Sequence, residues 1–471
     1  MSNKPPHGTE EVEGIASLVD TDLYKLTMQC AVLKNYPDVD VTYAYTNRTF
    51  DLKLSREGFE WIKAQVAKLG QLRLSQAELE FLQRACPYLP QTYLAYLEKF
   101  SFKPDDQLVL AFTPDTGVSD RMANEGNENS EKVEFADGSA KGDVRIDIKG
   151  KWVETILYEI PLLVLVSQAY FKFSNTDWNY EGQEEKAFAK GLQLLESGCA
   201  LSEFGTRRRR SYHTQELVLN GLVRATAHYE KSGGGEGKLL GTSNVHFAHR
   251  MGLNPIGTVA HEWFMGIAAI TNDYTRANEI GLRQWIDCFG EGVLSIALTD
   301  TFGTPHFLRN FALKYPPSGK SYAEIFAGVR QDSGDPEEFV KRMRKFYDEQ
   351  GIKSKKTIVF SDSLDVDLCL KYKELAEREG FVSSFGVGTF LTTANPSDDF
   401  VQLSSPGQRS WPLNIVVKVN SANGKPAVKI SDNISKNTGD RATVERVKQE
   451  LGYVEREWED GNERDRSGSR V

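Results

Sequence analysis

GTSNVHFAHRMGLNPIGTVAHEWFM, residues 241–265, contains two places where a short apolar segment runs into small polar residues and then into a helical pattern. The first is GTSN at 241–244 and the second is GTVAHE at 257–262. A strand that ends at a helix start exposes backbone N–H groups, and glycine lets a phosphate come close to them. His261 is expected to point into the same opening. The stretch therefore predicts phosphate chemistry that involves a histidine.

The same succession of strand, polar end and helix recurs through the second half of the chain. Apolar strands are expected to end in polar residues at 203–207, 241–244, 258–261, 299–300, 330–332, 361–362 and 386–389. Helical patterns lie between some of them, at 272–288, 336–349 and 363–376. Strand–helix alternation means parallel pairing, and the number of units suits an α/β barrel. A barrel gathers its polar active-site residues at the carboxyl ends of its strands.

The length of 471 residues is too great for one ordinary core and predicts two domains. The expected divisions are a disordered tail at 1–15, a mixed α+β domain at 16–150 with 400–455, a catalytic barrel at 151–399 and a disordered tail at 456–471. The segment 117–142 has few apolar residues and predicts a surface-loop insertion. Alternation at 413–430 predicts strands that rejoin the sheet of the mixed domain.

Shorter patterns place elements within and beside the mixed domain. The residues DTD at 20–22 are of the types that cap the N-terminus of a helix, and they predict a helix at 23–34. Alternation of apolar and polar residues predicts a strand at 39–47. A long buried helix is expected at 152–170. Pro161 should end or kink that helix near Ile160.

Composition and charge limit the classes of function. The net charge of −9 argues against a nucleic-acid-binding surface, which usually carries a basic field. The five cysteines form no CxxC pair, so neither a disulfide framework nor a zinc site is predicted, and a reducing interior fits best. The longest aliphatic run, 162–166, is too short to span a bilayer, and the N-terminus lacks the apolar region of a secretory signal. We expect a cytoplasmic protein without nucleic-acid or membrane partners, with a nuclear pool left open.

His261 has a structural alternative, because a lone histidine at a strand end most often bonds to a backbone carbonyl and does nothing else. Here Thr258 and Glu262 surround it, and Asp300 ends the next predicted strand. A carboxylate that holds one imidazole nitrogen makes the opposite nitrogen a good nucleophile. These neighbours favour a catalytic His261 that Asp300 orients.

Arginines and carboxylates at other strand ends give further candidates. EFGTRRRR at 203–210 can be a solvated basic helix start. Four arginines after Gly-Thr in an acidic protein can instead bind an anion, because guanidinium suits phosphate and carboxylate. In RQDSGD at 330–335, Asp335 fits a helix cap, so Arg330 and Asp332 need another explanation.

The turn GVGT at 386–389 is a weak signal alone, but it lies in the last strand–helix unit, where barrels commonly bind phosphate. Two aromatic residues, Tyr24 and Phe302, can belong to the core. Tyr24 follows Asp22 in a polar helix start, which makes its complete burial less expected.

Several of these stretches match a known family in sequence order. They are DTDLYKLTM at 20–28, EFGTRRR at 203–209, GTSNV at 241–245, GTVAHEW at 257–263, LTDTF at 298–302, VRQDSGDP at 329–336, FSDSLD at 360–365 and GVGTFL at 386–391. Together they resemble the nicotinate phosphoribosyltransferases, most closely the shorter fungal and bacterial branch, over roughly 15–435. The resemblance implies a type II phosphoribosyltransferase fold, an irregular α/β barrel beside a mixed α+β domain. The insertion at 117–142 has no counterpart in it.

The resemblance also implies a reaction. Nicotinate and phosphoribosyl pyrophosphate give nicotinate mononucleotide and pyrophosphate, and ATP hydrolysis is coupled to this step through a phosphorylated His261 that Asp300 orients. The other implied roles are the pyridine-acid site for Tyr24, Phe204, Thr258 and Arg330, contact with the ring and the phosphoribosyl group for Arg207 and Asp332, and the 5′-phosphate site for Gly386, Gly388 and Thr389. Asp332 can stabilise positive charge on the sugar, and the anionic leaving group implies Mg²⁺ with unassigned ligands.

Alternative functions stay open at this point. In nicotinamide phosphoribosyltransferases an acidic residue follows the glycine–threonine pair, whereas this chain has Ser243, whose hydroxyl can donate to nicotinate. A non-enzymatic sensor of phosphoribosyl metabolites is expected to have lost His261, Asp300 or Asp332, and all three are present. Quinolinate phosphoribosyltransferases are shorter and lack the histidine motif. Monomer and homodimer are both allowed, with Tyr24 in its own or a neighbouring subunit's site.

Overall fold

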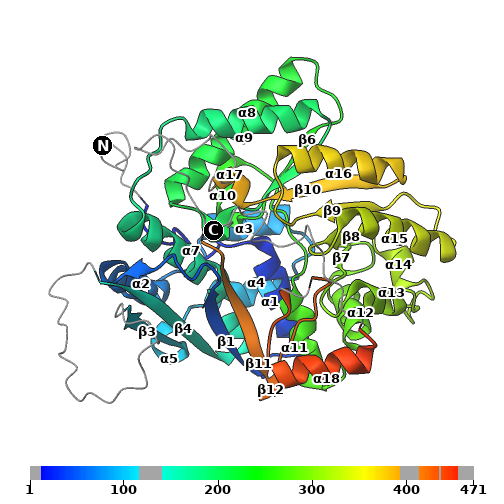
Figure 1. Cartoon of the computed structure of the whole chain (residues 1–471), viewed down its shortest axis with the longest axis horizontal. Helices are drawn as coiled ribbons and strands as arrows, with labels where there is room; N and C mark the ends of the chain where they lie inside the picture. The colour runs from blue at the N-terminus through cyan, green and yellow to red at the C-terminus, as the bar shows by residue number, and fades with distance from the viewer. Residues whose placement is uncertain (1–11, 116–139, 393–412, 434–435, 454–471) are drawn as a thin grey trace, which may run out of the picture.

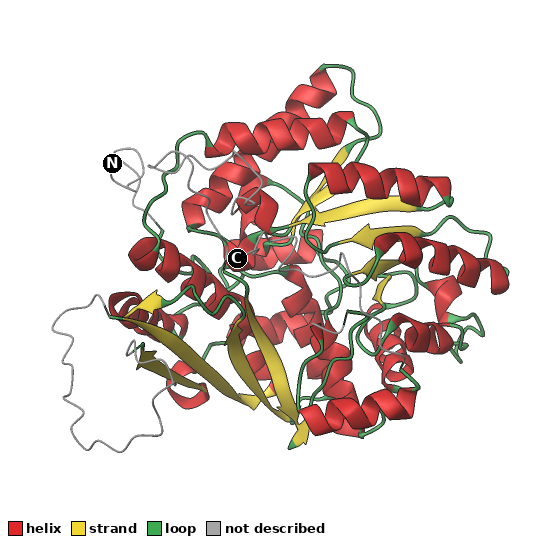
Figure 2. Cartoon of the chain, in the orientation of Figure 1, coloured by secondary structure: helices red, strands yellow, loops and turns green. Residues whose placement is uncertain are grey.

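The computed structural model describes residues 12–115, 140–392, 413–433 and 436–453. Their helices and strands form two β-sheets with helices packed around them (Figure 1, Figure 2). One sheet is parallel and the other is antiparallel. A single cluster of buried apolar side chains continues from one sheet to the other. Both sheets therefore share one hydrophobic core.

Six parallel strands form the sheet that corresponds to the predicted barrel. In the spatial order β6-β5-β10-β9-β8-β7 they are Lys238–Thr242, Ala200–Glu203, Val382–Val387, Thr357–Phe360, Gly328–Gln331 and Ile296–Leu298. Each strand runs into polar residues that the sequence places at its carboxyl end. Within the described residues the sheet is open, because β6 and β7 are its two edges.

One predicted strand, which was to end at 258–261, is not a strand. Pro255 makes only an isolated parallel bridge to β6, and proline has no N–H with which to continue a ladder. The carbonyl oxygen of Thr258 accepts a hydrogen bond from the Thr27 hydroxyl (2.7 Å). The segment reaches the site as an extended loop that leads into helix α11 (His261–Thr271).

Helices connect and flank the parallel strands. In chain order they are α8 (Gln183–Glu196), α9 (Tyr212–Lys231), α10 (Val245–Met251), α12 (Ala277–Phe289), α13 (Thr304–Phe311), α14 (Tyr322–Ile325), α15 (Pro336–Glu349), α16 (Val366–Arg378) and α17 (Thr389–Thr392). The helix predicted at 336–349 is confirmed as α15. Asp335 caps it by accepting a hydrogen bond from the Glu338 N–H (2.8 Å), as predicted. The helices predicted at 272–288 and 363–376 begin later, at Ala277 and Val366.

The second sheet is antiparallel and brings together distant parts of the chain. In the order β12-β11-β1-β4-β2, with β3 beside β4, its strands are Lys425–Pro426, Ile415–Ala422, Asp40–Asn47, Lys141–Lys151, Leu54–Ser55 and Leu108–Pro114. Pairing of β1 with β11 confirms that the late strands return to the N-terminal sheet, and Figure 1 shows them side by side. β4 already begins at Lys141, so the insertion predicted at 117–142 ends earlier; its residues 117–139 lie outside the described residues.

The tails predicted at 1–15 and 456–471 lie mostly outside the described residues. The end of the first tail is an exception. The Gly14 N–H donates to the side-chain oxygen of Gln168 (3.1 Å), and Gly14 is buried. The prediction of disorder is therefore wrong at this position, because a buried side-chain amide holds the backbone.

The remaining helices surround the antiparallel sheet or connect it to the parallel one. They are α1 (Leu23–Asn35), α2 (Arg56–Leu69), α3 (Gln76–Ala85), α4 (Gln91–Lys99), α5 (Pro104–Gln107), α6 (Trp152–Thr155), α7 (Glu159–Ala169) and α18 (Arg441–Leu451). The helix predicted at 152–170 is interrupted at 156–158 by a 3₁₀ turn. The cause is Pro161, which lacks an N–H and whose ring crowds the carbonyl group of Leu157.

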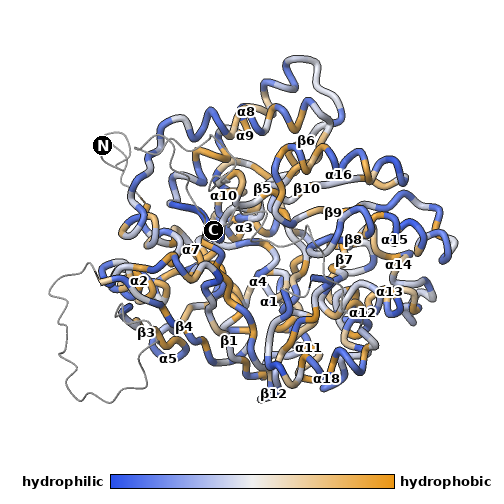
Figure 3. The backbone as a smooth tube through the Cα atoms, viewed as in Figure 1, coloured by the Kyte–Doolittle hydropathy of each residue, from blue (hydrophilic) through white to orange (hydrophobic). Residues whose placement is uncertain are grey.

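Trp152–Ser174 is the one helical run of the described chain that is long and apolar enough to cross a membrane. In this structure 83% of its most apolar window is buried inside the protein. Figure 3 shows hydrophobic segments gathered around α7. The run is packed as a core helix.

Candidate active site

A cavity of about 710 Å³ extends along the parallel strands, from first residues such as Ala200 and Thr357 to the residues that follow their carboxyl ends. Almost all predicted site residues line it, namely Tyr24, Phe204, Arg207, Ser243, Thr258, His261, Arg330, Asp332, Gly386, Gly388 and Thr389. Asp300 lies behind this wall and is 1% exposed. The structure therefore brings together residues that the sequence separates by more than three hundred positions.

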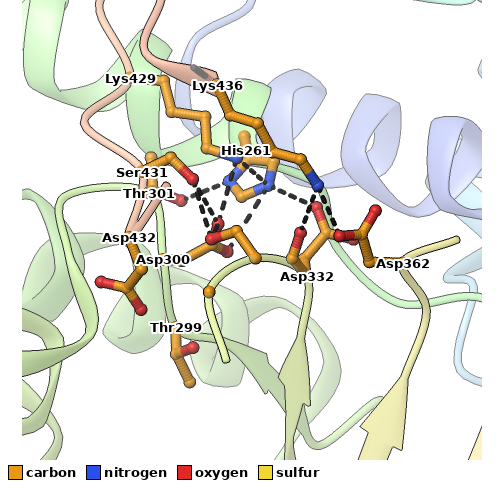
Figure 4. A network of polar contacts seen from close by, with 12 residues as sticks. His261, Thr299, Asp300, Thr301, Asp332, Asp362, Lys429, Ser431, Asp432 and Lys436 are labelled. Carbon is orange, nitrogen blue, oxygen red and sulfur yellow. Dashed lines mark hydrogen bonds and ion pairs between the residues drawn. The ribbon is translucent and has the colours of Figure 1, made fainter. Parts of the chain in front are cut away.

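His261 is the first residue of α11 and stands at the centre of a polar network (Figure 4). Its Nδ1 is 3.0 Å from the Thr301 hydroxyl. Its Nε2 is 2.9 Å from Lys429 Nζ and 3.0 Å from Asp332 Oδ2. Asp300 Oδ1 is 3.7 Å from the same Nε2. The carboxylate nearest to the imidazole is thus Asp332, and the nitrogen opposite to it is held by a hydroxyl.

The Asp300 carboxylate lies beside His261 Nε2, whereas Nδ1 contacts the Thr301 hydroxyl. Its Oδ2 accepts hydrogen bonds from Ser333 (2.5 Å) and Ser431 (3.1 Å), and it lies 3.2 Å from Lys429 Nζ. These three donors fix the carboxylate beside Nε2. Asp300 therefore sets the electrostatics of the imidazole and anchors Lys429.

The ionisation states of the network follow from burial and close charges. Burial and the neighbouring Lys429 lower the pKa of His261, which favours the neutral ring. Although burial opposes it, Lys429 and His261 lower the pKa of Asp300 to about 2. Burial raises the pKa of Asp332 as well, but Arg330 and His261 outweigh this effect and hold the pKa well below its usual range. The site combines a neutral imidazole with two ionised carboxylates.

Two lysines of the site were missed by the sequence reasoning. Lys429 is 4% exposed and contacts His261 and Asp300, as described above. Lys436 Nζ is 2.8 Å from Asp362 Oδ2 and donates to the backbone oxygen of Asp332 (3.0 Å). Both follow β11; Lys429 lies in the stretch 413–430, which the sequence marks only by its alternation, and Lys436 lies beyond it. Their one signal is a cation on each side of the polar run SDNIS at 431–435.

The arginine run at 207–210 is divided between the cavity and the core. Arg207 and Arg208 line the cavity. Arg209 is 0% exposed and forms an ion pair with Asp20 (2.7 Å), and Arg210 is 2% exposed against the rings of Phe171 and Trp178. The prediction that all four arginines bind an anion is wrong for the last two, because their charges are buried in structural contacts.

Comparison with known proteins shows the family to which the chain belongs. The nicotinate phosphoribosyltransferase (NAPRTase) family matches residues 199–455, and the N-terminal domain of that family matches residues 19–119. The chain belongs to this family.

Relatives within the nicotinate phosphoribosyltransferase family align over nearly the whole chain. The nicotinate phosphoribosyltransferase of Saccharomyces cerevisiae is 44% identical and covers 95% of this chain and 98% of its own. That of Methanosarcina mazei is 38% identical and covers 91% of this chain and 96% of its own. A solved structure from Saccharomyces cerevisiae has a TM-score of 0.84 at 42% identity and covers 94% of this chain and 100% of its own. The predicted resemblance and fold class are confirmed.

The family resemblance assigned Gly386 and Gly388 to the phosphate site. In the structure both glycines pack against Phe204. A Cβ atom at Gly386 would lie 2.4 Å from a ring carbon of Phe204, and one at Gly388 would lie 2.9 Å from its backbone oxygen. The Phe204 N–H donates to the carbonyl of Val387 (2.8 Å). Only glycine lets this turn pack so closely on Phe204. The turn therefore positions Phe204, the residue predicted to stack on the pyridine ring.

The hydrogen bond that Ser243 makes in the structure differs from its predicted role as a donor to nicotinate. Its hydroxyl donates to Asp22 Oδ1 (2.8 Å), and both side chains are buried. A hydroxyl has one proton, so in this arrangement Ser243 has none to give to a ligand. Asp22 in turn makes no side-chain cap to α1, although the sequence predicted one. Burial raises the pKa of Asp22, which makes its environment sensitive to added negative charge.

We expect Ser243→Asp to raise the nicotinate KM at least about tenfold, because two carboxylates at hydrogen-bonding distance repel one another and a substrate acid. The matched variant Ser243→Ala removes only the bond to Asp22 and should change the KM severalfold less. Steady-state kinetics with nicotinate provide the measurement. An unchanged nicotinate KM in Ser243→Asp would contradict the expected repulsion between the carboxylates.

Proposed function

We propose that this protein transfers the phosphoribosyl group of phosphoribosyl pyrophosphate to nicotinate, and that ATP hydrolysis is coupled to the transfer through a phosphohistidine at His261. The names of the curated relatives support the transfer. The observation that supports the ATP-coupled part is the placement of His261 Nε2 between Lys429 and Asp332 on the cavity wall.

The cavity suits anionic substrates that carry an aromatic ring. Its cationic lining residues are Arg48, Arg207, Arg208, Arg330, Lys418, Lys429 and Lys436. Guanidinium groups bind phosphates and carboxylates with paired hydrogen bonds. Tyr24 and Phe204 supply aromatic surface on which a pyridine ring can stack. We assign the nicotinate carboxylate to Arg207 and Arg330.

His261 acts as the nucleophile in the proposed ATP step. When Nδ1 carries the ring proton and donates it to Thr301, Nε2 keeps its lone pair beside the Lys429 ammonium. Attack of Nε2 on the γ-phosphorus forms the N–P bond and breaks the bond to the bridging oxygen, and ADP leaves with that electron pair. Water later cleaves the N–P bond, which releases phosphate and restores the imidazole. Lys429 offsets the charge of the transferred group.

Asp332 connects this step to the sugar chemistry. Its Oδ2 is 3.0 Å from Nε2, so a phosphoryl group on Nε2 displaces this contact and changes the charge around the carboxylate. In the transfer, the pyridine nitrogen bonds to ribose C1 while the C1–O bond to pyrophosphate breaks. Positive charge develops on the sugar, and an ionised Asp332 stabilises it. Its pairing with Arg330 (2.7 Å) keeps Asp332 ionised.

The surroundings of Asp300 fit a divalent cation. Asp300 Oδ1 is buried and makes no hydrogen bond within the described chain. Ligand atoms of His261, Asp300 and Asp332 lie within 4.8 Å of one another. Carboxylate oxygens are the ligands that Mg²⁺ prefers. Asp300 and Asp332 would hold Mg²⁺, which when bound offsets the charge of phosphate groups.

The pH dependence of ATP hydrolysis should show the environment of His261. Burial and Lys429 lower its pKa below the usual 6.5, and only the neutral ring has a lone pair for phosphorus. We therefore expect the acid limb of the kcat profile below pH 6.5. Lys429→Met should move this limb to higher pH, because loss of the cation raises the imidazole pKa. An unmoved limb in that variant would contradict the assignment.

Incubation of the full chain with nicotinate, phosphoribosyl pyrophosphate and Mg²⁺, with and without ATP, tests the proposal. Chromatography follows the mononucleotide, and we expect ATP to increase its yield while phosphate is released. Product from nicotinamide but not from nicotinate would favour the amide-specific alternative. Tight binding of phosphoribosyl pyrophosphate with no product from either base would favour a sensor.

A further inference from the structure

Lys25 is a buried cation that the proposed chemistry does not use. It lies on α1 next to Tyr24, and it is 0% exposed. Its Nζ is 2.5 Å from Glu262 Oε2 and also contacts Glu159 Oε2. Glu262 follows His261 on α11, and Glu159 begins α7. One ammonium group therefore joins three helices and is shared by two carboxylates.

The two carboxylates have different surroundings. Glu262 Oε1 accepts hydrogen bonds from the Tyr43 hydroxyl (2.6 Å) and the Trp152 ring N–H (2.8 Å). The oxygen of Glu262 that does not contact Lys25 is therefore bonded to neutral donors. Glu159 Oε1 instead lies 3.8 Å from Arg207 Nη1, and both Glu159 and Arg207 line the cavity. Lys25 and Arg207 thus stand on either side of the Glu159 carboxylate.

This arrangement controls how much of the Arg207 charge is available to a ligand. With Lys25 in place, the negative charge of Glu159 is already offset, and Arg207 can attract a second anion. Without Lys25, Glu159 would have Arg207 as its only cationic partner among these contacts. Asp22 and Asp332 add negative charge around Arg207, which makes the balance sensitive to one further charge.

We propose that Lys25 and Glu159 are positioning residues that set the preference of the site for a pyridine carboxylate over the neutral pyridine amide, through the charge left on Arg207. The inference rests on the proposed function, in which the nicotinate carboxylate meets Arg207. It concerns discrimination between substrates and leaves the sugar chemistry unchanged.

Three variants of the full chain test this charge balance. Lys25→Met is expected to raise the nicotinate KM about tenfold, with little change in the inhibition constant of nicotinamide. Glu159→Gln is expected to act in the opposite direction and lower the nicotinate KM, since Lys25 keeps Glu262 as a partner. The double variant should return towards the wild-type KM, because one charge of each sign has been removed. The KM for phosphoribosyl pyrophosphate should change less than the nicotinate KM in each variant, because the nicotinate carboxylate is assigned to Arg207.

Lys34→Met on the same helix is the matched control, because Lys34 is exposed and, within the described residues, its ammonium group donates to the backbone oxygen of Asp287. If Lys25→Met does not fold, the nicotinate KM values of Glu159→Gln and of the double variant still test the inference. A higher nicotinate KM in Glu159→Gln, or a change in the KM of phosphoribosyl pyrophosphate alone, would overturn the inference. A wild-type protein that neither binds nor converts nicotinate would overturn the proposed function instead.

Discussion

His261→Asn is expected to abolish nicotinate-stimulated ATP hydrolysis while slow phosphoribosyl transfer without ATP persists. The amide side chain fills a similar space but has no ring nitrogen that can attack phosphorus, so the hydrolysis rate should fall at least about 10³-fold. Transfer should survive because Asp332 and the cavity arginines remain in place. Phosphate release and chromatography of the mononucleotide measure the two activities separately.

The covalent intermediate gives a second readout for the same variant. Label from γ-labelled ATP should appear on the wild-type protein in an acid-labile, base-stable form, and it should be absent from His261→Asn. His228→Asn is a suitable control, because His228 is exposed on α9. Nicotinate-stimulated ATP hydrolysis that persists in His261→Asn would refute the phosphohistidine.

Asp332→Asn should reduce phosphoribosyl transfer about 10²- to 10³-fold, with ATP or without it, which is typical for removal of one charge-stabilising group. Asn keeps a hydrogen-bonding oxygen but cannot offset positive charge on the sugar. It also breaks the ion pair with Arg330 (2.7 Å) and the contact with His261 (3.0 Å), so the ATP step should slow as well.

Asp335→Asn makes the same chemical change three residues later and serves as the control for Asp332→Asn. Asp335 caps α15, and Asn is an equally good cap, so both activities should be retained. Single-turnover measurements separate transfer from product release. Transfer at the wild-type rate in Asp332→Asn would remove Asp332 from the sugar step.

Several predicted residues that line the cavity lie at or just after the carboxyl ends of parallel strands. Arg330 lies in β8, Asp332 comes just after it and Gly388 directly follows β10, and parallel pairing brings these strand ends to one edge. His261 reaches the same cavity at the start of α11, after a segment that is not a strand. The pattern therefore located the cavity without coordinates. It could not show which groups lie closest: Asp332 is 3.0 Å from His261 Nε2, and Asp300, which was expected to hold the ring, is 3.7 Å from the same atom.

The residues that the sequence missed come from contacts over long chain distances. Lys429 is 168 positions from His261, and no local pattern records that pairing. Arg207 and Arg209 are identical letters two positions apart, yet one lines the cavity and the other is paired with Asp20 in the core. Only the tertiary arrangement distinguishes them. For the same reason, periodicity could not show that Pro255 would prevent the strand expected before 258–261.

The pairing of β1 with β11 has a consequence for synthesis of the protein. The parallel strands are complete at Val387, but Lys429 and Lys436 reach His261 and Asp332 only after the chain has turned back along its N-terminal sheet. A nascent polypeptide therefore cannot assemble the imidazole network until the residues up to Lys436 have left the ribosome. A frameshift or premature stop after β10 would leave His261 encoded but without the ammonium groups of Lys429 and Lys436 in the network around it.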